Sequence, residues 1–235
     1  DKHRERALKT KSGVPCRRGS RRQLILRAQP SAPQTRPGAE HRSDRRLGRV
    51  HALHYGRDGE AAKGRGRVFN AWLTEYGLIN KQRIAKCIKV YRHHQPDIAM
   101  PKPHRDLLIR LQQLYSLYLV TDGHKITQQR KVEALGVATY FKRIFITHQF
   151  GIVHAKPSLY CFEQIKKAEG CEWADILYLG DNPAKDFVSL NQVGAVTVRV
   201  RTGAHASVVG KPGFDATHHI ERLTDFETLL SHLTG

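Results

Sequence analysis

Long apolar runs are missing from this chain of 235 residues, and so are the cysteine spacings that mark common metal and redox sites. No stretch of about 18 apolar residues occurs, so nothing in the sequence is expected to span a membrane. The four cysteines form neither a Cys-x-x-Cys pair nor a zinc-binding spacing, which predicts reduced thiols and a cytoplasmic location. The N-terminus also lacks an apolar core of the kind found in secretory signals.

Acidic residues are scarce as well, since 21 Asp+Glu stand against 40 Lys+Arg and the net charge is +19. Such an excess ordinarily indicates an anionic partner, such as nucleic acid or a phosphate ester. The charge is uneven, because residues 1–68 hold 19 Lys+Arg and 6 Asp+Glu and so carry +13 of it. The remaining 167 residues carry only +6, so most of the basicity belongs to one segment.

Hydrophobic periodicity is almost absent from residues 1–67, where the only short apolar run is Leu24-Ile25-Leu26. Three interpretations are open. Disorder follows from a composition that cannot bury enough apolar surface to offset the entropy of ordering. A basic arm that holds RNA or DNA is less favoured, because Tyr55 is the only aromatic residue available to stack on bases. The abrupt start of ordinary patterning near Val68 favours the third, a non-native segment read out of frame.

From residue 68 onward the chain has the patterning of a folded protein. Apolar residues at helical spacing predict helices over 68–77, 84–91 and 107–114, and three prolines place a hinge or domain junction at 95–104. Short apolar runs then alternate with helical segments, which predicts an α/β fold with a doubly wound, Rossmann-like parallel sheet. Strands are expected at 117–120, 143–147, 176–179, 195–200 and 218–220, and helices at 126–135, 157–168, 185–193 and 223–233.

The most informative stretch is 177–187, an apolar run that ends in a glycine and two carboxylates five positions apart. In open α/β sheets ligands gather at the carboxyl ends of the strands, and Asp181 would lie at such an end. Gly180 would leave room for the backbone to turn, and Asp186 would return toward the same point. Two carboxylates suit Mg²⁺, so Asp181 and Asp186 are candidate metal ligands. The alternative is an ordinary turn in which Asp181 caps a helix.

Two further strand ends carry polar groups that would meet at the same edge of the sheet. Thr121 offers a hydroxyl, and the backbone amides of Asp122 and Gly123 can grip an anion at a turn into a helix. Lys156 adds a compact positive charge just before the helix expected from Pro157. Taken singly, Thr121 can be a helix cap, Lys156 a solvated lysine and Asp186 only an acceptor for backbone amides. Together with Mg²⁺, a hydroxyl and an ammonium are what a phosphoryl group requires.

These motifs resemble those of a known family. Residues 119–123 (Leu-Val-Thr-Asp-Gly), 156–157 (Lys-Pro) and 180–186 (Gly-Asp-Asn-Pro-Ala-Lys-Asp) are similar to three motifs of the haloacid dehalogenase-like (HAD) hydrolases. They correspond to the second, third and fourth motifs of the phosphatase-type branch with a small helical cap, subfamily I. The resemblance covers about residues 68–233.

The resemblance implies a phosphohydrolase that acts on a small phosphorylated metabolite with the help of Mg²⁺. It makes Thr121, Lys156 and Asp181 the catalytic residues. The phosphoryl group would be held by Thr121 and Lys156, with Asp122 and Gly123 beside them. The metal would be held by Asp181, supported by Asp186.

The first motif of that family, an apolar strand ending in Asp-x-Asp that supplies the nucleophile, is missing. No Asp-x-Asp occurs anywhere in the chain, and the apolar run at Leu24 continues as Arg-Ala-Gln-Pro-Ser over 27–31. The sequence therefore predicts a HAD-type core over 104–235 without its first-motif strand, a remnant of the cap over 68–103, and little or no hydrolysis. The competing class is a non-catalytic protein, either a degenerate phosphate-binding domain or a basic-tailed RNA-binding module.

Overall fold

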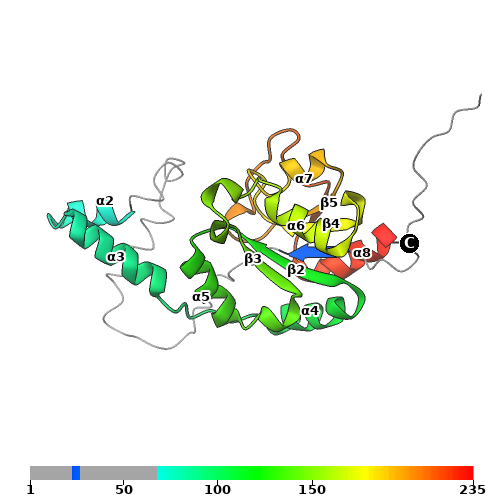
Figure 1. Ribbon diagram of the computed structural model, residues 1–235, viewed down its shortest axis with the longest axis horizontal. Helices are drawn as coiled ribbons and strands as arrows, with labels where there is room; N and C mark the ends of the chain where they lie inside the picture. The colour runs from blue at the N-terminus through cyan, green and yellow to red at the C-terminus, as the bar shows by residue number, and fades with distance from the viewer. Residues whose placement is uncertain (1–22, 27–67, 235) are drawn as a thin grey trace, which may run out of the picture.

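A parallel six-stranded sheet forms the centre of the computed structural model, which describes residues 23–26 and 68–234 (Figure 1). The strands lie in the order β3-β2-β1-β4-β5-β6, and every neighbouring pair is parallel. Because the strand order reverses beside β1, the sheet is doubly wound, and the predicted fold class is confirmed. The strands are β1 (Gln23–Leu26), β2 (Ser116–Thr121), β3 (Arg143–Ile146), β4 (Ile176–Gly180), β5 (Val196–Val200) and β6 (His218–Ile220).

Strand β1 corrects the expectation of a core without its first strand. It pairs with β2 on one side and with β4 on the other, and the side chain of Ile25 is fully buried. A run of four residues has little stability alone, but the central position gives it two hydrogen-bonded ladders. The prediction of a core without this strand is therefore wrong, because β1 lies between β2 and β4. The rest of the 1–67 segment lies outside the described residues.

Helices follow most of the strands, as the alternating pattern predicted. The α-helices are α2 (Val68–Glu75), α3 (Lys81–His93), α4 (Lys102–Leu114), α5 (Lys125–Leu135), α6 (Tyr160–Glu169), α7 (Val188–Gln192) and α8 (Phe226–Thr234). Short 3₁₀ turns join them: η2 (Ala138–Tyr140), η3 (Thr147–Gln149), η4 (Ile152–His154), η5 (Trp173–Asp175), η6 (Gly203–His205) and η7 (Leu223–Asp225).

The two faces of the sheet are covered by different helices (Figure 1). On one face α4, α5 and α8 pack over Leu117 and Leu119 of β2 and their neighbours in β4 and β5. On the other face α6 and α7 pack over Tyr118 and Val120 of β2 and over Tyr178 of β4. Over β2 and β4 both faces are apolar, which explains why these two strands are continuous apolar runs rather than alternating patterns. On β5 only the face with Val198 and Val200 is apolar, and Thr197 and Arg199 are buried on the other.

The helices α2 and α3 stand at one end of the molecule, beside α5 (Figure 1). The side chain of Asn80 accepts a hydrogen bond from the Arg83 amide at 2.7 Å and so caps the start of α3. An extended segment at 94–101 leads on to α4, where the prolines predicted a break. Within residues 23–26 and 68–234, no helix has the length and apolar character needed to cross a membrane.

Three helices begin three residues later than predicted. One of them, α8, begins at Phe226 after the 3₁₀ turn η7, and the other two lie near the candidate site residues. The helix expected from Pro157 begins at Tyr160, after a turn in which the Ser158 amide donates to the Ala155 carbonyl at 3.0 Å. The helix expected from Lys185 begins at Val188. A separate turn precedes it, in which the Asn182 carbonyl accepts from the amides of Lys185 and Asp186 at 3.2 and 2.9 Å. The starts of α6 and α7 lie at the edge of the sheet where the candidate site residues gather.

Candidate functional site

Thr121, at the end of β2, is buried and faces a side chain from the helix that follows. Its hydroxyl Oγ1 donates a hydrogen bond of 3.0 Å to Oε1 of Gln128, in α5. Gly123, between them in sequence, has a φ of 136°. This φ is one that favours glycine, and a Cβ at Gly123 would lie 2.6 Å from Nε2 of Gln128 and so displace that amide.

The carboxylate of Asp122 ties three segments of this edge together. Its Oδ1 accepts hydrogen bonds from the Thr147 hydroxyl at 2.8 Å and from the Lys156 amide at 3.1 Å. Its Oδ2 accepts from Nζ of Lys185 at 2.6 Å. Burial pushes the pKa of Asp122 upward, but the charge of Lys156 and the bond from Lys185 outweigh it, so the pKa lies below its ordinary value. The sequence assigned only the backbone of Asp122 to the site, and the structure adds this role for its side chain.

The ammonium of Lys156 is almost completely buried beside the end of β4. It donates to Oδ1 of Asp186 at 2.7 Å and to the hydroxyl of Tyr178 at 2.8 Å. The exposed fractions of the Lys156 and Asp186 side chains are 1% and 0%. A buried charge of this kind requires such partners, so the interpretation of Lys156 as a solvated surface lysine is wrong.

Asp186 uses both of its carboxylate oxygens inside the protein. While Oδ1 accepts from Lys156, Oδ2 accepts from the backbone amides of Asp181 and Asn182 at 3.2 and 2.9 Å. A Cβ at Gly180 would lie 2.9 Å from Oδ2, so the glycine lets this carboxylate approach the strand end, as the sequence suggested. These bonds favour a role for Asp186 in positioning Lys156 and the loop after β4, rather than direct contact with a metal.

Asp181 comes directly after β4 and is 7% exposed. A carboxylate oxygen at a strand end is the kind of ligand that Mg²⁺ takes. In the described part of the chain, no group of three or more His, Cys, Asp or Glu side chains is arranged to hold a metal ion. Asp181 therefore fits Mg²⁺ as one ligand among several, and the remaining ligands would have to include waters and the oxygens of a bound phosphoryl group.

The structure thus brings Thr121, Asp122, Gly123, Lys156, Asp181 and Asp186 to one edge of the sheet. Sequence reasoning missed four residues that contact them: Gln128, Thr147, Tyr178 and Lys185. Thr147 directly follows β3 and Lys185 lies inside the 180–186 motif, so position at a strand end was a usable signal for both. Nothing in the sequence distinguished Gln128 or Tyr178, because their roles depend on how α5 and Lys156 pack.

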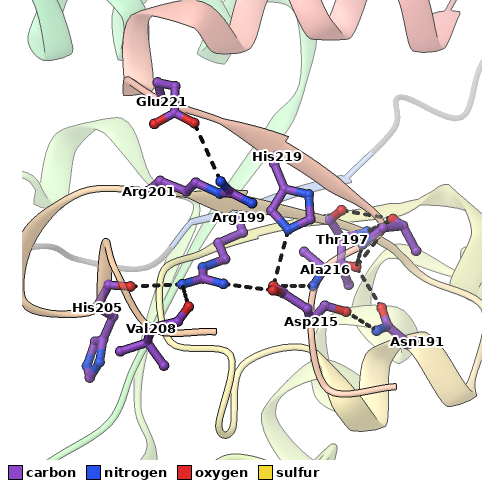
Figure 2. Close-up of polar contacts among 11 residues, drawn as sticks. Asn191, Thr197, Arg199, Arg201, His205, Val208, Asp215, Ala216, His219 and Glu221 are labelled. Carbon is purple, nitrogen blue, oxygen red and sulfur yellow. Dashed lines mark hydrogen bonds and ion pairs between the residues drawn. The ribbon is translucent and has the colours of Figure 1, made fainter. Parts of the chain in front are cut away.

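A second polar cluster surrounds Arg199 of β5 (Figure 2). The guanidinium is buried, and its Nη1 donates to Asp215 at 2.7 Å. Its Nη2 donates to the carbonyls of His205 and Val208 at 2.8 and 2.6 Å. Arg199 thereby fastens the connection between β5 and β6 onto the sheet at three points.

Comparison with known proteins agrees with the motifs. A model of the haloacid dehalogenase-like hydrolase family matches residues 28–194, and the chain therefore belongs to this family of hydrolases.

Among curated relatives, a glyceraldehyde 3-phosphate phosphatase from Methanopyrus kandleri is 31% identical over 143 residues, which cover 59% of this chain and 60% of the relative. A protein of the same name from Methanocaldococcus jannaschii is 26% identical over 141 residues, covering 58% and 61%. The chain thus spans about three fifths of the length of the curated relatives it matches.

Two solved structures show the same fold. A HAD-hydrolase from Bacillus subtilis bound to magnesium has a TM-score of 0.58 at 19% identity, covering 89% of this chain and 98% of that one. The L-2-haloacid dehalogenase from Xanthobacter autotrophicus has a TM-score of 0.57 at 14% identity, covering 90% and 98%.

Proposed function

We propose that this edge of the sheet binds the phosphoryl group of a small phosphate monoester, as in a HAD-type phosphatase. The observation that carries the proposal is the buried ammonium of Lys156, held by Asp186 and Tyr178 at the edge where Thr121 also ends its strand. A phosphoryl group spreads its charge over several oxygens, and a fixed cation with nearby hydroxyl and amide donors complements that charge. Thr121 and Lys156 would hold the group, with the amides of Asp122 and Gly123 beside them.

Mg²⁺ is part of this proposal for an electrostatic reason. The carboxylates of Asp122, Asp181 and Asp186 outnumber the ammonium groups of Lys156 and Lys185 by one, so these five side chains repel an anion overall. A divalent cation held by Asp181 would reverse the sign and stabilise charge on the phosphoryl oxygens. Asp186 would act indirectly, since its oxygens hold Lys156 and the turn after Gly180.

The substrate class rests on the relatives named glyceraldehyde 3-phosphate phosphatase, whose name describes a small phosphorylated molecule. We extend to this chain only the class, a small phosphorylated metabolite. The location that we propose is the cytoplasm, because Cys87, Cys161 and Cys171 are free thiols, as expected in a reducing compartment.

We propose further that the chain hydrolyses its substrate poorly or not at all. Strand β1 occupies the centre of the sheet, yet the sequence after it contains no acidic residue before Glu40 and no Asp-x-Asp anywhere. Without such a carboxylate no aspartyl phosphate can form, and binding alone would remain.

The test is calorimetric binding of inorganic phosphate to the full chain, with and without Mg²⁺. Binding is expected to weaken strongly on removing Mg²⁺, in Asp181→Asn and in Lys156→Met. Lys102→Met is the matched control, since Lys102 is 85% exposed and paired with Asp106 on the surface. Hydrolysis of a phosphomonoester that survives Asp181→Ala would contradict the site assignment, and phosphate affinity equal in all variants would contradict the proposed function.

The alternative is a non-catalytic protein in which residues 1–67, with their basic charge, hold RNA. Binding of this kind would depend steeply on salt, because neutralised phosphates release counterions. Titration of the full chain and of a chain without residues 1–67 against single-stranded RNA at two salt concentrations separates the cases. Salt-dependent affinity that disappears with the deletion would support the alternative.

A further inference from the structure

Thr121 uses its only proton inside the protein. A threonine hydroxyl carries one donor, and here Oγ1 donates that proton to Oε1 of Gln128 at 3.0 Å. The oxygens of a phosphoryl group only accept hydrogen bonds when they are ionised. In this arrangement Thr121 therefore has no proton to offer to such a group, although it lies buried at the end of β2, where the group would bind.

The side chain of Gln128 contains the means to release that proton. Its amide has an acceptor at Oε1 and donors at Nε2, and Nε2 lies on the side of Gly123, 2.6 Å from where a Cβ of that residue would be. The terminal torsion of glutamine is broad and roughly two-fold, so half a turn exchanges the two atoms without moving the backbone. The absence of a side chain at Gly123 leaves space for this exchange.

We propose that Gln128 is a positioning residue whose amide turns over when a phosphoryl group binds. After the turn Nε2 donates to Oγ1 of Thr121, and the hydroxyl proton of Thr121 is donated to a phosphoryl oxygen. No covalent bond is made or broken; one hydrogen bond reverses its direction. The inference rests on the proposed phosphoryl site, and it gives that site a role for α5 that none of the sequence motifs contains.

A simpler account makes the opposite prediction. If the amide stays fixed, phosphate binding turns the Thr121 proton away and leaves two acceptors, Oγ1 and Oε1, facing each other 3.0 Å apart. Gln128 would then oppose phosphate binding, and removing its amide would strengthen the affinity. If the amide turns over, Gln128 supports Thr121 as a donor, and removing it weakens the affinity.

The experiment is a double-mutant cycle on the full chain, with inorganic phosphate and Mg²⁺ in a calorimeter. Gln128→Met and Thr121→Val are each expected to weaken binding about threefold to tenfold, the range for one hydrogen bond. In the Thr121→Val background, Gln128→Met should change the affinity no further, because the residue acts through the hydroxyl. Stronger binding by Gln128→Met, or an equal loss in both backgrounds, would overturn the inference.

A second pair of variants does not depend on the first. Gln128→Glu at neutral pH can only accept, so it should hold the Thr121 proton and bind phosphate more weakly than Gln128→Met. Gln129→Glu adds the same charge one residue away, on the exposed side of α5, and is the control for the added charge; it also removes the hydrogen bond from Gln129 to Glu133. The loss of phosphate affinity in Gln128→Glu should also become smaller as the pH falls toward about 4.3, where a glutamic acid gains a proton to donate.

The outcomes separate the two proposals. Wild-type protein that binds no phosphate would remove both the proposed function and this inference. Phosphate binding that depends on Lys156 and Asp181, with equal losses in Gln128→Glu and Gln129→Glu, would leave the proposed function intact and overturn the role of Gln128.

Discussion

Two ion pairs with a buried cation lie beside neighbouring strands, and their surroundings differ. Near the end of β4, Lys156 meets Asp186 and a phenol hydroxyl. On β5, Arg199 meets Asp215 and two backbone carbonyls (Figure 2). The planar guanidinium is committed to three groups of the connection between β5 and β6. The ammonium of Lys156 is a compact charge on a flexible stem, which can share its donors with an incoming anion.

This difference assigns the two pairs to different purposes. The Arg199 pair fastens a connection, because Asp215, His205 and Val208, which accept from its guanidinium, all belong to that connection. The Lys156 pair shares its edge of the sheet with Thr121, Asp122 and Asp181. Burial of an ion pair is therefore a weak indication of function, and the groups around the pair are a better one.

The largest effect is expected for Lys156→Met, because both members of that pair are buried. Loss of the cation leaves the Asp186 carboxylate uncompensated, and the free energy of unfolding should fall by about 3 kcal/mol. Urea unfolding measures this, and phosphate binding should be lost as well. The double variant Lys156→Met/Asp186→Asn should regain much of the stability but none of the binding. A double variant as unstable as the single one would show that charge compensation is not what the pair contributes.

A smaller effect is expected for Arg199→Met, since the Asp215 side chain is 27% exposed and water can solvate it. The free energy of unfolding should fall by about 2 kcal/mol, mostly from the two carbonyls that lose their donor. Phosphate affinity should not change. The matched control is Arg201→Met, directly after the same strand, where an exposed guanidinium lies 4.0 Å from Glu221 and contributes less than about 0.5 kcal/mol. Loss of phosphate binding in Arg199→Met would break the distinction between the two pairs.

The smallest expected effect is on the stability of the protein at acidic pH. Burial raises the pKa of Asp122, but Lys156 and Lys185 lower it by more than burial raises it. The pKa therefore lies below its ordinary value of 3.8. Burial also raises the pKa of Asp215, but the Ala216 amide and Arg199 bring it below the ordinary value as well.

A carboxyl whose pKa is depressed by folding stabilises the protein above its unfolded pKa. That contribution is lost as the pH falls through the folded pKa. The stability lost on acidification below about pH 4 should therefore be smaller in Asp122→Asn and in Asp215→Asn than in the wild type. The reduction should be larger for Asp122, the less exposed of the two side chains. The urea midpoint of unfolding, measured from pH 6 downward, checks this. An equal dependence of that midpoint on pH in the wild type and in both variants would contradict it.

Strand positions were readable because buried strands such as β2 and β4 are short apolar runs, and because such runs alternate with helical segments along the chain. The strands β2 to β6 accordingly lie within a residue or two of the predicted ranges. The strand β1 was not assigned, because Leu24-Ile25-Leu26 is short and lies in a basic, polar segment. Its stability comes from pairing with residues about 90 and 150 positions away, which no local pattern records.

Side-chain roles divide in the same way. The residues at strand ends were found because every parallel strand delivers its last residue to one edge of the sheet. Asp186 was interpreted as a metal ligand, with binding to backbone amides as the alternative. In the structure its oxygens are turned to Lys156 and to two amides, a choice made by the approach of Lys156 from another loop. Gln128 acquires its role only when α5 places it over Gly123 and against Thr121.

Residue types and their order therefore identified the family, the parallel sheet and the edge at which Thr121, Lys156 and Asp181 meet. These follow from local rules, namely apolar runs, turn residues and the direction of parallel strands. Which carboxylate pairs with which cation, where Thr121 sends its proton and whether β1 closes the sheet follow from contacts between distant segments. Such contacts depend on packing in three dimensions, where a shift of one ångström makes or removes a hydrogen bond.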